Sequence, residues 1–290
     1  MRFGVREICN VSFKCKADNT KIGDTTFNKD ELVIYFDTCK TSSLEGSATD
    51  VFAQGGRGNP KLVTWSGEKE MKFTFEDALI SPLGLSILVG ANLSSSADYY
   101  HHVLVKATAG ENNTSSSDGK GKLDIVDAIH EIAGSEATLC DGKGQTEAEK
   151  AAAPKVYATD DAGSEIGAKV DLTSATISAN TIADTKIKPG TSYYVDGYVK
   201  VTGGQTLNIT PDKFSDYFYI EAETLFRNEA DGVDKPAQFI IPKGKISSNF
   251  NIAMANSGDP STFSFEVTAM PDYTKFDKKE KVLCAINILK

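Results

Sequence analysis

The chain has 290 residues, of which 40% are hydrophobic and 24% charged, and these proportions are typical of a folded globular protein. Acidic residues outnumber basic ones by 40 to 31, so the formal net charge is −9 at pH 7. This balance disfavours tight binding of nucleic acid, because proteins hold phosphates mainly through Lys and Arg. The most apolar stretch, residues 78–93, is interrupted by Ser81, Pro82, Gly84 and Gly90, so we expect no membrane insertion. Residues 1–7 carry no secretion signal, and we expect synthesis in a cytoplasm.

The first predicted elements are strands and one helix. Apolar residues alternate with polar ones over residues 71–76, and residues 33–36 are apolar throughout, which predicts two strands with at least one buried face. Ser81 and Pro82 precede an apolar run that ends at Gly90. Serine at the N-cap, proline in the first turn and glycine after the last turn are helix signals, so we predict a short buried helix over residues 82–89.

Residues 41–60 separate these two strands and are rich in Ser, Gly, Thr and Asn. Without periodicity, they predict an irregular loop of unusual length, and such loops are often functional. A contact with a partner and a flexible surface loop are equally good interpretations of this segment.

The middle of the chain changes in composition. Residues 108–154 read as a loose polar insertion with a short helix, and residues 155–200 read as a small β-rich, Ig-like insertion with turns at 160–163 and 188–190. Alternating patterns then predict strands near residues 249–254, 263–268 and 282–288. We therefore predict a mainly β (α+β) fold, in which residues 1–107 and 201–290 form one β-sandwich or barrel with a short flanking helix.

The sequence contains few candidates for catalysis or cofactor binding. The five cysteines, Cys9, Cys15, Cys39, Cys140 and Cys284, are odd in number and widely spaced, which favours free buried thiols over zinc ligands or disulfides. His101 and His102 are adjacent on a strand and point to opposite faces, so they do not chelate one metal unaided. Glu221 and Glu223 could form an acid–base pair, although a solvated or interface face is the commoner role. We predict no enzyme and no catalytic, cofactor or metal residues.

Several strings resemble structural proteins of tailed bacteriophages. They are residues 2–7 (RFGVRE), 35–38 (YFDT), 40–46 (KTSSLEG), 52–59 (FAQGGRGN), 73–82 (FTFEDALISP) and 256–263 (NSGDPSTF). Their order, with a long loop, an alternating strand, a short helix and a C-terminal pair of strands, resembles the tail tube protein family of the contractile-tail type. The resemblance covers roughly residues 1–107 and 201–290, and residues 108–200 lie outside the minimal fold as an external decoration.

This resemblance implies a structural virion protein that forms homohexameric rings, and the rings stack into a tail tube assembled in the host cytoplasm. Strands of neighbouring subunits would pair into an inner β-barrel, through which genomic DNA passes to the host without specific binding. The implied partners are the chain itself, the tail sheath and baseplate or initiator proteins. The implied subunit-interface residues are Glu45, Gln54, Arg57 and Asn59, with Arg57 facing a carboxylate of a neighbouring subunit.

Three alternatives stay open on the sequence. A capsid or baseplate component would share the β-rich composition, and its assembly shape would separate it from a tube. A β-rich adhesin would bind sugar or protein, although no secretion signal supports this reading. A glycan-cleaving virion enzyme would need a pair of carboxylates in a cleft.

Overall fold

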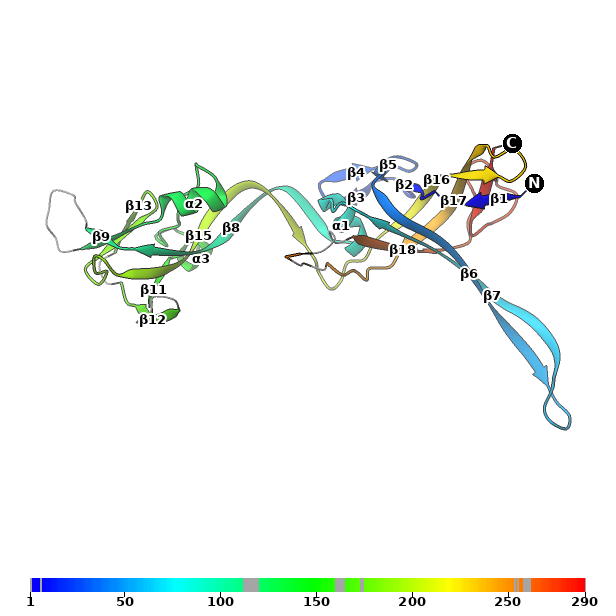
Figure 1. Ribbon diagram of the computed structural model, residues 1–290, viewed down its shortest axis with the longest axis horizontal. Helices are drawn as coiled ribbons and strands as arrows, with labels where there is room; N and C mark the ends of the chain where they lie inside the picture. Colours follow the sequence, from blue (N-terminus) through cyan, green and yellow to red (C-terminus); the bar gives the residue numbers. More distant parts are fainter. Residues whose placement is uncertain are drawn as a thin grey trace. The chain divides into compact units, whose positions relative to one another are not determined.

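The computed structural model describes residues 2–5, 7–111, 120–159, 165–172, 175–252, 254, 256–257 and 262–289. The chain forms two compact units (Figure 1): unit 1 consists of residues 1–94 and 207–290, and unit 2 of residues 95–206. Strands make up 56% of the structure and helices 8%, which confirms the predicted mainly β fold. No helix in the described part of the chain is long and apolar enough to cross a membrane.

Unit 1 is built on one large antiparallel sheet. Its strands are β1 (Phe3–Val5), β2 (Asn10–Cys15), β5 (Leu32–Phe36), β6 (Cys39–Gln54), β7 (Lys61–Asp77), β16 (Tyr217–Asn228), β17 (Asp234–Ile246), β18 (Phe263–Ala269) and β19 (Ala285–Ile288). The order is β5-β2-β16-β17-β18-β7-β6, with β1 beside β16 and β19 beside β17. A separate hairpin is formed by β3 (Thr20–Ile22) and β4 (Thr25–Phe27).

One face of this sheet buries the core of unit 1. Phe13 on β2, Phe75 on β7 and Phe265 on β18 are 0 to 2% exposed, and the rings of Phe75 and Phe265 stack with centroids 4.9 Å apart. Helix α1 (Pro82–Val89) covers this core with Leu88, which is fully buried. The alternation in the sequence therefore reflects one dry sheet face.

Helix α1 confirms the helix predicted over residues 82–89. The Oγ of Ser81 accepts a hydrogen bond from the backbone N–H of Gly84 at 2.9 Å, which satisfies one free donor of the first turn. Gly90 closes the helix in the left-handed region, with φ of 67°. Local capping chemistry is thus enough to define both ends.

Only part of the C-terminal region forms the strands predicted from the sequence. The strand predicted near residues 263–268 is β18, and the one near 282–288 is shortened to β19. No strand forms at residues 249–252, and Ala253 lies outside the described residues, so the prediction for 249–254 is wrong over its described part. Alternate positions of that segment are Asn, a residue depleted in strands, and this opposes the apolar alternation. Residues 258–261 of the string at 256–263 also lie outside the described residues.

The predicted loop at residues 41–60 is also wrong, because most of it is strand. Strands β6 and β7 pair in antiparallel register from Cys39↔Asp77 to Gln54↔Lys61. Only residues 55–60 form the connection. Figure 1 shows the two strands continuing as a two-stranded ribbon past the rest of the sheet of unit 1.

Unit 2 contains two four-stranded sheets and two short helices. Its elements are β8 (Asn92–Thr108), β9 (Gly110–Glu111), β10 (Gly121–Asp124), β11 (Lys155–Thr159), β12 (Ile166–Val170), β13 (Thr176–Ser178), β14 (Thr181–Asp184), β15 (Ser192–Asn208), α2 (Val126–Ala133) and α3 (Glu147–Ala151). The orders are β13-β14-β10-β9 and β12-β11-β15-β8. Strands β8 and β15 carry the chain across the boundary between the units.

The boundaries of unit 2 differ from those predicted at 107/108, 154/155 and 200/201. Leu123 and Leu139, from the segment predicted to be loose, share one buried core with Val156 and Val195 from the segment predicted to be a separate module. Few apolar residues stand among the polar ones before residue 155, yet Leu123, Ile125, Ile129 and Leu139 are buried in this core. The predicted turn at 160–163 lies outside the described residues.

Candidate functional site

The candidate site is the exposed part of the ribbon formed by β6 and β7, which we call the arm and define as residues 47–70. None of these residues is buried. Strand β7 changes character along its length, because its first ten residues are exposed and only the part from Met71 onward enters the sheet core. A long hairpin that contributes nothing to its own core needs another role, and an exposed strand pair is a ready surface for contacts with another chain.

The distal part of the arm carries apolar side chains. Val51 pairs with Trp65, and Ala53 pairs with Val63, so all four side chains lie on one face of the ribbon. The exposed fractions are 59% for Val51, 55% for Trp65 and 49% for Val63. We call residues 51–65 the arm tip. Exposed apolar side chains concentrated in this way are typical of interaction surfaces.

The turn of the arm tip has internal contacts that give it a defined shape. The Nδ2 of Asn59 donates a hydrogen bond to the Oε1 of Gln54 at 3.1 Å. Gly56 and Gly58 adopt φ of 84° and 88°, a region that favours glycine. The ammonium of Lys61 lies 3.5 Å from the centroid of the Phe52 ring. This cation–π contact holds the positive charge of Lys61 against the ribbon.

The four residues predicted at a subunit interface are not all together. Gln54, Arg57 and Asn59 are gathered in the turn of the arm tip, whereas Glu45 lies on β6 near the base of the arm, paired with Lys72. The apolar face next to the turn was not predicted from the sequence. The short alternations Val51–Ala53 and Val63–Trp65 could have indicated it, but they become one face only once the strands pair.

All charged residues of the arm tip have the same sign. Among residues 51–65, Arg57 and Lys61 are basic and no residue is acidic. This part of a chain with net charge −9 is therefore positive. Its contacts with a surface of opposite charge are favoured, and contacts with another positive surface are not.

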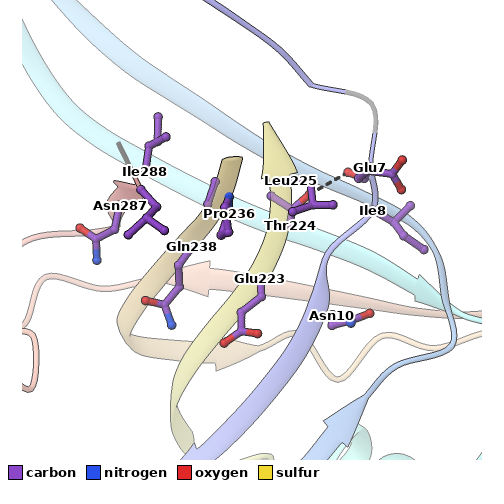
Figure 2. A pocket seen from close by; sticks show the side chains of 12 residues that line it. Glu7, Ile8, Asn10, Glu223, Thr224, Leu225, Pro236, Gln238, Asn287 and Ile288 are labelled. Carbon is purple, nitrogen blue, oxygen red and sulfur yellow. Dashed lines mark hydrogen bonds between the residues drawn. The ribbon is translucent and has the colours of Figure 1, made fainter. Parts of the chain in front are cut away.

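The sheet of unit 1 also carries a groove of about 700 Å³ (Figure 2). It is lined by Glu7, Ile8, Asn10, Glu223, Thr224, Leu225, Pro236, Ala237, Gln238, Asn287, Ile288 and Leu289. The hydroxyl of Thr224 donates a hydrogen bond to the carbonyl oxygen of Glu7 at 3.0 Å, and this bond fixes the chain before β2 against β16. The side chains of Ile8, Leu225 and Leu289 are 39, 41 and 65% exposed, so the groove offers apolar surface beside its two carboxylates.

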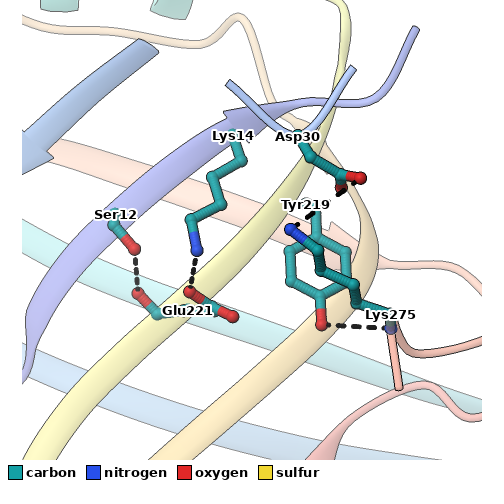
Figure 3. A network of polar contacts seen from close by, with 6 residues as sticks. All are labelled: Ser12, Lys14, Asp30, Tyr219, Glu221 and Lys275. Atoms are coloured by element: carbon teal, nitrogen blue, oxygen red, sulfur yellow. Dashed lines mark hydrogen bonds and ion pairs between the residues drawn. The ribbon is translucent and has the colours of Figure 1, made fainter. Parts of the chain in front are cut away.

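The carboxylates of Glu221 and Glu223 are not equivalent. Figure 3 shows the carboxylate of Glu221 next to the ammonium of Lys14, with which it forms an ion pair. The backbone N–H of Lys275 donates to the phenolic oxygen of Tyr219 at 3.4 Å. This network ties β2, β16 and the C-terminal segment together. Glu221 therefore has a structural partner, whereas Glu223 is exposed at the groove.

The described residues contain no cluster of three or more His, Cys, Asp and Glu side chains arranged for a metal ion. The Nε2 of His102 lies 2.9 Å from the Oδ1 of Asp196, which gives this histidine a local partner. All five cysteines are free: Cys9, Cys15 and Cys39 are buried, and Cys140 and Cys284 are half-buried. Burial raises the pKa of the Cys39 thiol to about 12 and that of Cys284 to about 11, and thiols with raised pKa values are poor nucleophiles.

The described part of the chain is thus a mainly β protein whose arm leaves an exposed strand pair free for contacts with another chain. The model of the YomU/Tube protein family matches residues 20–128 and 124–282. The chain belongs to this family, and the family is one of phage-like tube proteins, which are structural components of a virion tail. No curated protein matches the chain.

Proposed function

We propose that the chain is the subunit of a phage tail tube, that it assembles with itself into homohexameric rings, and that the rings stack into a conduit through which DNA is ejected. The observation that carries the proposal is the arm. A hairpin with no buried residue and an apolar tip reaches away from its own sheet, and a neighbouring subunit would cover it. Membership of the YomU/Tube family supports the same reading.

The proposal also names the other partners. In a contractile tail, a sheath would surround the tube, and baseplate or initiator proteins would begin its assembly. DNA would pass without specific binding, because the net charge of −9 disfavours adhesion of phosphates. Unit 2, with a core of its own, would decorate the tube and leave the ring-forming sheet to unit 1.

The experiment that tests this proposal reverses one charge on the arm tip. Arg57→Glu places a negative charge where the tip is positive, so we expect a folded monomer that no longer assembles. Ultracentrifugal pelleting measures the assembled fraction, and circular dichroism checks the fold. Lys278→Glu, an equal charge change at an exposed residue outside the arm, is the control and should pellet like the unchanged protein. Normal pelleting of Arg57→Glu would reject this role of Arg57.

A further inference from the structure

The arm tip and the groove of unit 1 are complementary in both charge and polarity. Two basic residues and no acidic one lie in the arm tip, namely Arg57 and Lys61. Two acidic residues and no basic one line the groove, namely Glu7 and Glu223. Opposite potentials steer and orient an encounter between two surfaces.

The apolar parts match as well. The tip presents Trp65, Val63 and Leu62, which are 49 to 65% exposed. The groove presents Ile8, Leu225 and Leu289 between its carboxylates. A buried apolar centre with charged groups around it is the usual anatomy of a protein interface, and a tryptophan is a frequent anchor in such a centre.

The two carboxylates face solvent, although Glu7 also interacts with Arg227, whose pKa is raised mainly by Asp234 and further by the charge of Glu7. Arg227, which lies two positions along β16 from Leu225, is engaged by Asp234, with its Nε and Nη2 2.7 and 2.8 Å from the two carboxylate oxygens. Glu7 and Glu223 are both exposed. No residue of the arm lines this groove in its own chain. A second copy of the chain can therefore supply the basic groups.

We infer that the groove bounded by Glu7 and Glu223 receives the arm tip of a second copy of this chain. This inference rests on the proposed function and adds the surface that the arm contacts. Because tip and groove are different surfaces, each copy offers one of each, and the contact is head-to-tail. Repetition of a head-to-tail contact generates rings or open filaments instead of a closed two-fold dimer.

The test compares three variants with the unchanged full-length protein. Glu7→Lys/Glu223→Lys reverses the groove, Arg57→Glu/Lys61→Glu reverses the tip, and a fourfold variant carries both reversals. Trp65 is the single tryptophan of the sequence and lies in the tip, so its fluorescence reports burial of the tip directly. We would follow the emission maximum and the pelleted fraction across a concentration series, with circular dichroism to verify folding. Glu280→Lys, a single charge reversal at an exposed residue outside the groove, is the control.

The inference predicts that the emission of the unchanged protein and of Glu280→Lys shifts to shorter wavelength as concentration rises. Each twofold reversal should raise the concentration needed for this shift by more than about tenfold, because like charges then face each other. The fourfold variant should recover most of the loss, since complementarity returns. Neutral Glu7→Gln/Glu223→Gln, which is less disruptive to folding, should show an intermediate loss.

Three results would overturn the inference. Assembly that survives the groove reversals would place the tip elsewhere and leave the proposed function standing. A blue-shifted emission that is independent of concentration would mean that the tip is covered within its own chain. An unchanged protein that neither pellets nor shifts at any concentration would reject the second copy as occupant, and the proposed self-assembly with it.

Discussion

At the scale of single residues, Cys39 holds the start of β6 in the core of unit 1. It begins β6 opposite Asp77, and its side chain is buried with the phenylalanines of the sheet. Burial is the main reason that its pKa rises to about 12, and the neighbouring carboxylate of Asp77 adds to the effect. The thiolate is thus disfavoured at this position at every physiological pH.

This shift predicts a pH dependence of stability. Above an unfolded pKa of about 9, the unfolded chain loses the Cys39 proton while the folded chain keeps it. The folded state then binds more protons, so the free energy of unfolding falls as pH rises from about 9 towards 12. Urea unfolding at pH 8 and pH 10.5 under reducing conditions measures this fall, which we expect to be smaller in Cys39→Ala. An identical fall in both proteins would show that Cys39 does not contribute.

At the scale of secondary-structure elements, the arm shows where sequence patterns stop being informative. The part of β7 from Phe73 to Asp77 was predictable because one of its faces is dry and the other is not. Neither face of the arm is buried in the isolated chain. The sequence of its two strands therefore shows no alternation of apolar and polar residues over most of their length. The register of β6 with β7 defines it instead, and that register is not visible in local composition.

The candidate site could also be predicted only in part from the sequence. Arg57 and Asn59 could be singled out because they lie in the string at residues 52–59 that resembles tail tube proteins. The groove could not, because Glu7, Glu223 and Gln238 come from distant parts of the sequence. Only the pairing of β16 with β2 and β17 brings these segments together.

The arm can be shortened without loss of the core, which gives a prediction at this scale. Gly46 and Met71 are register partners, so an Asn-Gly turn can replace residues 47–70. No buried residue is removed, and we expect a change of less than about 1 kcal/mol in stability, or about 2–4 °C in the melting temperature. Assembly should be abolished. Calorimetry and pelleting measure the two effects, and full assembly of the shortened chain would contradict a role for the arm.

At the scale of the whole molecule, the two units have separate cores. The buried residues of the unit 1 core lie before residue 92 or after residue 217, and those of unit 2 lie between residues 103 and 199. The sequence indicated an insertion, but it placed a loose segment before a compact one. The buried residues of the first segment are too far apart in the sequence to suggest a core. They come together only in the folded unit, as Leu123, Ile129 and Leu139 show.

Separate cores predict that unit 2 can be removed as a whole. Replacing residues 95–206 by a short Gly-Ser linker should leave unit 1 folded with its own cooperative thermal transition. Deleting only residues 110–153 should unfold unit 2, because it removes four buried side chains of its core, Leu123, Ile125, Ile129 and Leu139. Thermal unfolding followed by circular dichroism distinguishes the two. Loss of the unit 1 transition in the first variant would contradict independent cores.

Many copies of the chain are proposed to assemble into a tail tube. Electron microscopy of the purified, concentrated protein under reducing conditions tests this assembly most directly. Reducing conditions keep the five thiols free, so that disulfide cross-links do not stand in for assembly. We predict long hollow tubes of uniform width. Closed shells, or separate monomers at every concentration, would contradict a tail tube subunit.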